Sequence, residues 1–422
     1  MRDRTVRLAA SRTSRAEPDS RGQEAVLGRE WHNWSGSLRF TPREYATPPD
    51  EDAVRALVER ARHTSTKLRP VGSGHSSSPL VRTDDVLVSL AGLPRTVRRH
   101  DDPHLATVGA GVPLGELGEA LYEAGLAMDN LGDVDVQSIA GATATGTHGT
   151  GLAFGNLSTQ VAGARLVSGT GEVLEISERQ NRDLLPAVQL SLGALGVLTT
   201  LTLRLTPTYH LRRRNWCSSI AWTLDHLHQL QRQNRNMDFY WYPRTDTTQI
   251  RTLNLRGEEP EFSPAGEPRT TETGPSHRTI PRHRELRFDE IEYAIPSEAF
   301  HACFTEIRRR ILDRHRTGVA WRVLVRTCAE DDIWLSPAYG RTTTTIACLQ
   351  NNALPHEEYF KDVEAVFRQY DGRPHWGKKH SLTADGLRGV YPQWDRFQDV
   401  RRRLDPDEVF LTPDLAALLR DG

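Results

Sequence analysis

The first residues that could carry chemistry form a loop of small side chains, Gly72-Ser-Gly-His-Ser76. Consecutive backbone N–H groups in such a loop can cradle an anion such as phosphate, and His75 places an imidazole among them. A G-x-G-x-x-G dinucleotide fingerprint is excluded because residue 77 is Ser, and no Gly-Lys-Ser/Thr follows. A G-x-S-x-G nucleophile elbow is excluded because residue 78 is also Ser. Taken alone, the loop is most simply interpreted as a structural turn.

A second stretch, residues 140–151, consists only of Ala, Gly, Thr and one His. Chains use so many small residues where the backbone approaches a neighbour closely. The composition predicts neither a packed helix nor a single turn, and it indicates close backbone contact with a neighbour or ligand.

Two cations stand out further along the chain. Arg326 ends a predicted strand, and Lys378 follows His375 in an aromatic, glycine-containing segment. Only four of the 54 basic residues are Lys, which makes the pair Lys378–Lys379 conspicuous. An aromatic segment can hold a cation partly desolvated over a ring or an anion. The alternative, two ordinary surface cations, is the commoner case for any single Arg or Lys.

The sequence offers little support for a metal site. His226 and His228 lie two apart on a predicted helix and therefore do not share a face. His375 and His380 have only Asp371 as a nearby carboxylate, and no cysteine. We therefore expect no metal.

Composition excludes several classes of function. Lys and Arg total 54 and Asp and Glu total 55, so the chain lacks the basic excess typical of nucleic-acid binders and polybasic membrane anchors. No apolar run is long enough to predict a membrane span. Four scattered cysteines without a CxxC motif, and an N-terminus without an apolar signal stretch, predict free thiols and a cytoplasmic location.

With 422 residues, the chain is too long for one ordinary core, so we expect two domains. Alternating helix-like and strand-like patterns predict an α+β fold throughout. Residues 256–284 read as a long surface loop. The expected divisions are a disordered arm (1–30), a first domain (31–207), a second domain (208–370) and a C-terminal segment (371–422).

Together these segments resemble the aldonolactone oxidase and alditol oxidase group (gulonolactone-oxidase-like) of the vanillyl-alcohol-oxidase-type FAD-binding superfamily. The likeness runs in order from Trp31 to Leu419. It rests on a collinear set of motifs: Asn33-Trp-Ser-Gly36, Val71-Gly-Ser-Gly-His-Ser76, Asn130-Leu-Gly132, Ser138-Ile-Ala-Gly141, Ala144-Thr-Gly-Thr-His-Gly149, Ser191-Leu-Gly-Ala-Leu-Gly-Val197, Trp334-Leu-Ser-Pro-Ala-Tyr-Gly340 and Arg373-Pro-His-Trp-Gly-Lys378.

The resemblance implies an FAD-binding domain, rejoined by the C-terminal segment, beside an antiparallel-sheet substrate (cap) domain. His75 matches the histidine that is bonded covalently to the flavin in much of this group. Val197 would touch the adenine side. The residues implied to bind the cofactor are Val71, Gly72, Ser73, Gly74, His75, Ser76, Gly132, Ser138, Gly141, Thr145, Gly146, Thr147, His148, Val197 and His375.

The implied chemistry is flavin oxidation of a hydroxyl-bearing carbon, with hydride passing to flavin N5. Lys378 would stabilise the anionic reduced flavin, and Arg326 would face the substrate oxygen. Gly132 matches a small residue that leaves oxygen a path in oxidases, so O2 is the expected acceptor and H2O2 the product. The expected partners are therefore a small-molecule substrate and O2, without nucleic acid or membrane.

Three substrate-pocket positions depart from the group. Leu324 replaces the usual Glu two residues before Arg326, which removes a carboxylate and leaves Arg326 without its expected partner. Asp133 replaces a serine of alditol oxidases and could restore a carboxylate from the opposite wall. Leu349 stands where alditol oxidases have Thr. These changes predict a specialised sugar-like or amino-sugar-like substrate.

Two alternatives stay open. One is an FAD-dependent dehydrogenase with another electron acceptor. The other is a degenerate member that keeps the fold but only binds a ligand, for which Leu324 would be a sign of lost chemistry.

Overall fold

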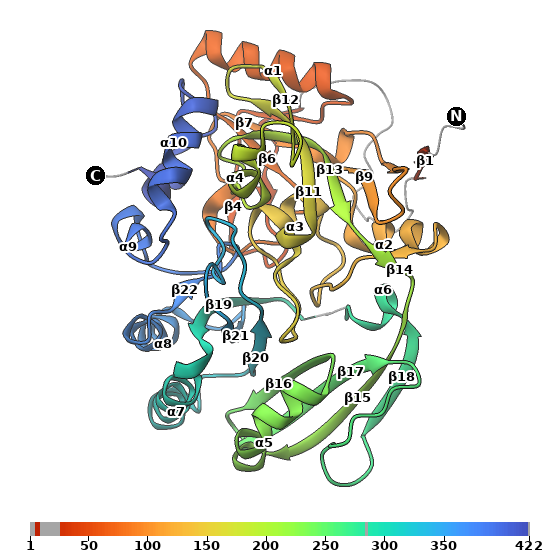
Figure 1. Ribbon diagram of the computed structural model, residues 1–422. Helices are drawn as coiled ribbons and strands as arrows, with labels where there is room; N and C mark the ends of the chain where they lie inside the picture. Colours follow the sequence, from red (N-terminus) through yellow and green to blue (C-terminus); the bar gives the residue numbers. More distant parts are fainter. Residues whose placement is uncertain (1–4, 9–25, 283–285, 421–422) are drawn as a thin grey trace.

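The computed structural model describes residues 5–8, 26–282 and 286–420, and it confirms the predicted α+β fold (Figure 1). The described residues form two layered parts. One contains a six-stranded sheet of order β1-β8-β9-β13-β11-β12 and a four-stranded sheet of order β2-β5-β7-β6. The other is built on an eight-stranded sheet of order β18-β15-β17-β16-β20-β21-β19-β22, in which every strand pair is antiparallel.

The first part positions the two small-residue segments. Its first long helix begins after Asp50, because the Asp50 side chain accepts the Ala53 N–H at 2.8 Å and so caps the helix. The main elements are β5 (Glu44–Ala46), α1 (Glu51–Thr64), β6 (Leu68–Val71), β7 (Val86–Ser89), β8 (Thr96–Arg99), β9 (Leu105–Gly109), α2 (Leu114–Glu123), α3 (Ile139–Ala144), β11 (Val161–Ser168), β12 (Val173–Ser177), α4 (Leu185–Gln189) and β13 (Gly196–Arg204).

The eight-stranded sheet packs one face into an apolar core, and its other face carries charged side chains beside a smaller apolar cluster. Helices α5, α7 and α8 supply Leu227, Phe304 and Val363 to a core that also holds inward-facing strand residues such as Phe239. The elements of this part are β15 (His210–Ser219), α5 (Ile220–Gln233), β16 (Asn236–Tyr242), β17 (Thr247–Leu255), β18 (Thr270–Pro275), α6 (Ser276–Thr279), β19 (Phe288–Pro296), α7 (Phe300–Arg310), β20 (Val323–Cys328), β21 (Thr343–Asn351) and α8 (Glu357–Gln369). Strand alternation leaves the other face for charged side chains.

The C-terminal segment joins both parts. Strand β22 (Arg373–Pro374) pairs with β19, and then α9 (Ala384–Arg388), α10 (Trp394–Leu404) and α11 (Pro413–Leu419) pack into the core of the first part. The Leu68 N–H donates to the Val409 carbonyl at 2.8 Å, which ties β6 to this segment. The boundaries at 207 and 370 remain predictions.

Three local predictions are wrong. Within the arm 1–30, β1 (Thr5–Arg7) pairs with β8 and β2 (Val26–Leu27) pairs with β5, so these two segments are not disordered. Residues 1–4 and 9–25 lie outside the described residues. Within the predicted loop 256–284, β18 pairs with β15 as an edge strand of the sheet, and the helix α6 follows it. The pairing is through backbone groups, so the polar side chains of β18 gave no sign of it. Residues 283 and 284 are not described.

The third wrong prediction concerns the start of the stretch 140–151, because residues 140–144 belong to the packed helix α3 (Ile139–Ala144). The Ser138 hydroxyl accepts the Gly141 N–H at 3.3 Å and caps this helix, and its small side chains let it approach the loop after β6. All four cysteines are free, as predicted. Among the described helices, none combines the length and apolar character needed to cross a membrane.

Candidate active site

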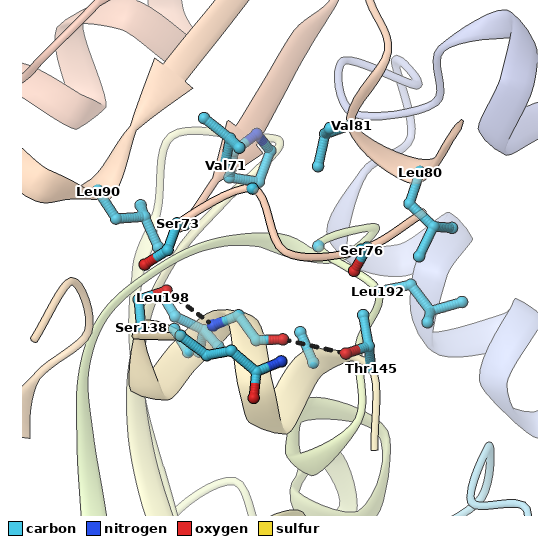
Figure 2. Close-up of a pocket in the computed structure, with 18 of the residues that line it drawn as sticks. Val71, Ser73, Ser76, Leu80, Val81, Leu90, Ser138, Thr145, Leu192 and Leu198 are labelled. Carbon is cyan, nitrogen blue, oxygen red and sulfur yellow. Dashed lines mark hydrogen bonds between the residues drawn. The ribbon is translucent and has the colours of Figure 1, made fainter. Parts of the chain in front are cut away.

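A cavity of about 790 Å³ lies between the loop that follows β6 and the N-terminal end of α3. Figure 2 shows Ser73 and Ser76 on the loop, facing Ser138 and Thr145 across the cavity. A Cβ added at Gly72 would lie 2.1 Å from the Ser138 hydroxyl oxygen, so glycine at this position leaves room for the side chain that caps α3. The cavity is therefore lined by closely spaced backbone groups suited to an elongated anionic ligand.

The loop is fixed from both sides. The Trp34 N–H donates to the Gly74 carbonyl at 2.8 Å, and the Ser77 N–H donates to the Gly377 carbonyl at 2.9 Å. Gly74 has φ +66°, a left-handed conformation that suits glycine, and its Cβ position would lie 2.7 Å from the Trp31 ring. The Trp34 ring packs against the imidazole of His75 with 4.7 Å between centroids. These contacts pre-position His75 at the cavity wall.

A second cavity of about 600 Å³ adjoins the first. His75, Ser76, Gln137 and Thr145 line both cavities, so the two spaces meet at the imidazole. The remaining lining residues of the second cavity come from both parts of the fold and the C-terminal segment: Asp133, Val134, Thr147, His148, Phe288, Glu290, Glu292, Leu324, Arg326, His375, Gly377 and Lys378. We call this second cavity the substrate pocket.

The pairing of β20, β21 and β19 sets the order of side chains beneath the substrate pocket. Ala347 of β21 pairs with Leu324 on one side and with Glu292 on the other, so these three residues form one row on one face of the sheet. Ala347 is small, and the next β21 residue on this face is Thr345, the register partner of Arg326. These short side chains let the guanidinium of Arg326 reach across β21 to Glu292.

Glu292 forms a buried charge cluster with Arg326 and His148. Its Oε1 accepts from Arg326 Nη2 at 2.8 Å and lies 3.1 Å from His148 Nε2. Burial alone would raise the pKa of Glu292, but the charges of Arg326 and His148 outweigh burial and hold the pKa well below its usual value. Nearby, burial lowers the pKa of His375 to about 4, so this imidazole is neutral at physiological pH.

The other two carboxylates of the substrate pocket also have cationic partners. Glu290 forms an ion pair with Lys378. Asp133 accepts from Arg251 Nη2 at 2.8 Å and from the Tyr240 hydroxyl at 3.1 Å. Each carboxylate of the pocket is therefore neutralised by a neighbouring cation.

The structure brings most of the predicted site residues together. Of the predicted catalytic pair, Arg326 and Lys378 both line the substrate pocket, 52 positions apart in the sequence. Asp133 and Leu324 line the same pocket, as predicted. The predicted residues that line one or both cavities as cofactor candidates are Val71, Gly72, Ser73, Gly74, His75, Ser76, Ser138, Gly141, Thr145, Thr147, His148 and His375.

Four predicted residues lie behind the cavity walls. Val197 is fully buried in the core, because strand alternation turns its neighbours Gly196 and Leu198 toward the cavity instead. Leu349 is fully buried against Leu324 and does not line the substrate pocket, so its contact with the substrate stays a prediction. Gly132 backs Thr147, whose Cγ2 would lie 3.1 Å from an added Cβ. Gly146 lines a small cavity behind the substrate pocket.

Sequence reasoning missed two residues of the substrate pocket that matter most to its charge, Glu290 and Glu292. The prediction that Arg326 lacks a partner is wrong, because Glu292 supplies one from β19. A signal was present, since two carboxylates two positions apart in a strand must share a face. Nothing in the sequence showed that this face points into the pocket.

His148, Glu292 and His375 also form a group that could offer three metal ligands, because one donor atom from each lies within 4.8 Å of the others. The sequence could not show this group, since its members lie on three distant segments. Arg326 already holds the carboxylate, and adding a divalent cation beside this guanidinium would be electrostatically costly. The expectation of a metal-free site remains a prediction.

Comparison with known families supplies independent support. Residues 42–177 match the family model described as "FAD binding domain", and residues 262–418 match "D-arabinono-1,4-lactone oxidase". An L-gulono-1,4-lactone dehydrogenase of Mycobacterium tuberculosis is 38% identical, with coverage of 90% of this chain and 97% of that protein. An L-gulonolactone oxidase of Mus musculus is 28% identical, with coverage of 91% of this chain and 97% of that protein. An alditol oxidase of Streptomyces sp. is 29% identical, with coverage of 92% of this chain and 99% of that protein.

The fold has relatives among solved structures. A cholesterol oxidase from B. sterolicum superposes with a TM-score of 0.82 at 18% identity, covering 92% of this chain and 96% of that one. This likeness supports the two-part architecture alone. The cofactor is FAD, and the glycine-lined cavity between the loop after β6 and α3 fits its pyrophosphate. The chain belongs to the aldonolactone oxidase group, FAD-linked oxidoreductases of sugar lactones or alcohols, within the vanillyl-alcohol-oxidase-type FAD-binding superfamily.

Proposed function

We propose that the chain is an FAD-dependent oxidase that converts a hydroxyl-bearing carbon of a sugar-like lactone or alcohol into a carbonyl, with O2 as the electron acceptor. The balanced reaction removes two electrons and two protons from the substrate, and O2 takes them up as H2O2. FAD, when bound, supplies the hydride acceptor. The observation that carries the proposal is the junction of the two cavities at His75, with Arg326 and Lys378 lining the second.

The chain's own residues would divide the work between holding the cofactor and orienting the substrate. The backbone N–H groups of residues 72–76 and of the α3 N-terminus would hold the pyrophosphate. His75 would carry the covalent link to the flavin, because its imidazole lies at the wall that both cavities share. Arg326 would face the substrate oxygen and stabilise negative charge that develops as the hydroxyl proton leaves, and Lys378 would place its positive charge beside the flavin.

The charges of the pocket favour an uncharged, hydroxylated substrate. Asp133, Glu290 and Glu292 each have a cationic partner. An added ammonium group would have to compete with these partners, whereas hydroxyl groups can share them. Of the sugar-like and amino-sugar-like substrates that the sequence left open, the pocket therefore favours a neutral lactone or polyol.

A second candidate is a dehydrogenase that passes electrons to an acceptor other than O2. It is favoured by the relative that is 38% identical and is named a dehydrogenase. The oxidase is favoured by Gly132, which adds no side chain behind Thr147 at the pocket wall. A degenerate, non-catalytic member has less support, because both predicted catalytic cations line the pocket. A cytoplasmic location stays part of the proposal.

The experiment that separates these candidates follows the reduced enzyme. The purified protein is reduced anaerobically with L-gulono-1,4-lactone or a polyol and is then mixed with air-saturated buffer or with an artificial electron acceptor. An oxidase regains its flavin absorbance in air and releases one H2O2 for each flavin oxidised. Slow recovery in air with fast recovery by the artificial acceptor would establish the dehydrogenase, and the absence of reduction by any lactone or polyol would reject both.

A further inference from the structure

The carboxylate missing at position 324 has a counterpart in the same row of the sheet. Glu292 and Leu324 both pair with Ala347, from opposite sides of β21. Because adjacent strands lie about 4.8 Å apart, Glu292 stands roughly 10 Å from position 324 along this row. Both residues line the substrate pocket, so the chain presents a carboxylate on the same sheet face but nearer to the C-terminal segment.

The two oxygens of Glu292 have different surroundings. Oε1 takes the hydrogen bond from Arg326 at 2.8 Å and lies 3.1 Å from His148 Nε2. Oε2 is buried and has no hydrogen-bond partner among the described residues. A buried carboxylate oxygen without a donor is costly, which indicates that a ligand or a water supplies one.

Resting on the function proposed above, we propose that Glu292 is a specificity-determining residue whose Oε2 accepts a hydrogen bond from a substrate hydroxyl group that is not the one oxidised. Arg326 and His148 fix the carboxylate from the other side, so its free oxygen is presented in one orientation. The ligand class is a neutral polyhydroxylated lactone or alcohol with at least two hydroxyl groups. The hydroxyl group that is oxidised faces Arg326, and another one reaches Glu292 on β19.

The protonation state of Glu292 suits an acceptor rather than a base. The neighbouring cations hold the pKa of Glu292 well below its usual value despite burial, so the carboxylate stays ionised at physiological pH and is a poor proton acceptor. An ionised oxygen forms a stronger hydrogen bond with a hydroxyl group than a neutral one does.

A water molecule is the competing partner for Oε2. Glu292 also lines the small cavity behind the pocket, together with Asn156, Thr345 and His375. That cavity is small and partly lined by polar side chains, so it offers a water molecule hydrogen-bond partners. If water satisfies Oε2 from behind, substitution at Glu292 will not discriminate between substrate hydroxyl groups.

The test compares the wild type with Glu292→Gln, which keeps the size of the side chain and removes its charge. The ligands are L-gulono-1,4-lactone and its derivatives that each lack one hydroxyl group. Calorimetry measures their Kd on enzyme whose flavin has been reduced beforehand, so no turnover occurs. Anaerobic flavin bleaching gives the rate constant for each ligand that is still oxidised.

The proposal expects one derivative to bind the wild type about 10- to 100-fold more weakly than the parent lactone, as for loss of a hydrogen bond to a charged group. In Glu292→Gln this difference should shrink to less than about threefold, while the other derivatives keep their wild-type ratios to the parent. Equal ratios for every derivative in wild type and variant would overturn the proposal and assign Oε2 to water.

Two controls keep this result interpretable. The double variant Glu292→Gln/Leu324→Glu returns a carboxylate to the position usual in the group, and its preference should move to a different hydroxyl group if the carboxylate reads the substrate. If it does not move and Glu292→Gln alone weakens all ligands equally, the role of Glu292 is structural and the proposal is wrong. Failure of wild-type flavin to bleach with any lactone or polyol would instead reject the proposed function.

Discussion

Replacing Gly72 with Ala tests whether the loop after β6 and α3 must touch to form the FAD cavity. The added Cβ would lie 2.1 Å from Ser138 Oγ, the atom that caps α3 by accepting the Gly141 N–H. Overpacking at such a contact costs about 1–3 kcal/mol, and displacing the cap costs about 1 kcal/mol more. The sum, about 2–4 kcal/mol, predicts a fall of roughly 5–15 °C in the melting temperature of this part of the fold.

A double-mutant cycle assigns the cost to this contact. Ser138→Ala alone removes the cap and should cost about 1 kcal/mol. In Gly72→Ala/Ser138→Ala the nearest remaining atom is the Cβ of residue 138, at 3.3 Å, which is tight but tolerable. The double variant loses the cap only once and is relieved of the clash, so it should be more stable than Gly72→Ala, with a coupling free energy of about 2–4 kcal/mol.

The assay follows the release of FAD on heating by flavin fluorescence, together with the molar ratio of FAD to purified protein. Gly318→Ala is the matched control, since its added Cβ meets only the His315 carbonyl at 3.7 Å. Gly72→Ala should bind less FAD and release it at a lower temperature than this control. The reasoning is refuted if both Gly→Ala variants behave alike, or if Ser138→Ala adds its full cost to Gly72→Ala.

Three further changes have defined outcomes. His75→Ala should abolish flavin fluorescence of the protein band on a denaturing gel, whereas His148→Ala should keep it. The reason is that His75 lines both cavities, whereas the ring nitrogens of His148 contact the Gly149 carbonyl and the Glu292 carboxylate. The reverse pattern would move the covalent link to His148. The pKa of His375 is about 4 in the fold and about 6.5 in the unfolded chain, so the unfolded state binds more protons between these two pH values. The free energy of unfolding should therefore fall as the pH drops from 6.5 to 4, by at most about 3 kcal/mol. Urea unfolding of His375→Asn should show a flatter pH dependence than the wild type, and an unchanged pH dependence would contradict the assignment. In Gly132→Ala the added Cβ would lie 3.1 Å from Thr147 Cγ2. This variant should be reoxidised by O2 severalfold more slowly than the wild type, with anaerobic reduction by substrate unchanged. Equal stopped-flow reoxidation rates in variant and wild type would remove Gly132 as support for an oxidase.

Local sequence signals predicted most of the scaffold. The Asp50 cap of α1 and the hairpin of β11 and β12 each depend on residues close together in the chain, which is why patterns along the sequence indicate the α+β class. Edge strand β18 escaped prediction because its polar residues pair through backbone groups with β15. Helix α3 escaped because its stability depends on packing against the loop after β6 rather than on helix propensity.

The parts of the candidate site that lie in short sequence motifs could be predicted. The parts that depend on how the strands of the sheet are paired could not. The loop 72–76 and the cations Arg326 and Lys378 could be found from composition and spacing, and the resemblance gave them roles. The partner of Arg326 could not, because Glu292 reaches it across an intervening strand whose small residues Thr345 and Ala347 had no visible purpose in the sequence. Val197 and Leu349 are both fully buried, so their expected contacts with adenine and substrate stay predictions.

The most direct test of FAD-dependent oxidation of a sugar-like substrate is the anaerobic titration of the purified protein with sugar lactones and polyols, followed by flavin absorbance. We expect the protein to carry one FAD and to lose its oxidised-flavin absorbance with at least one neutral lactone or polyol, at a rate that falls sharply in Arg326→Met and Lys378→Met. A flavin-free protein, or a flavin that stays oxidised with every such compound, would contradict this expectation.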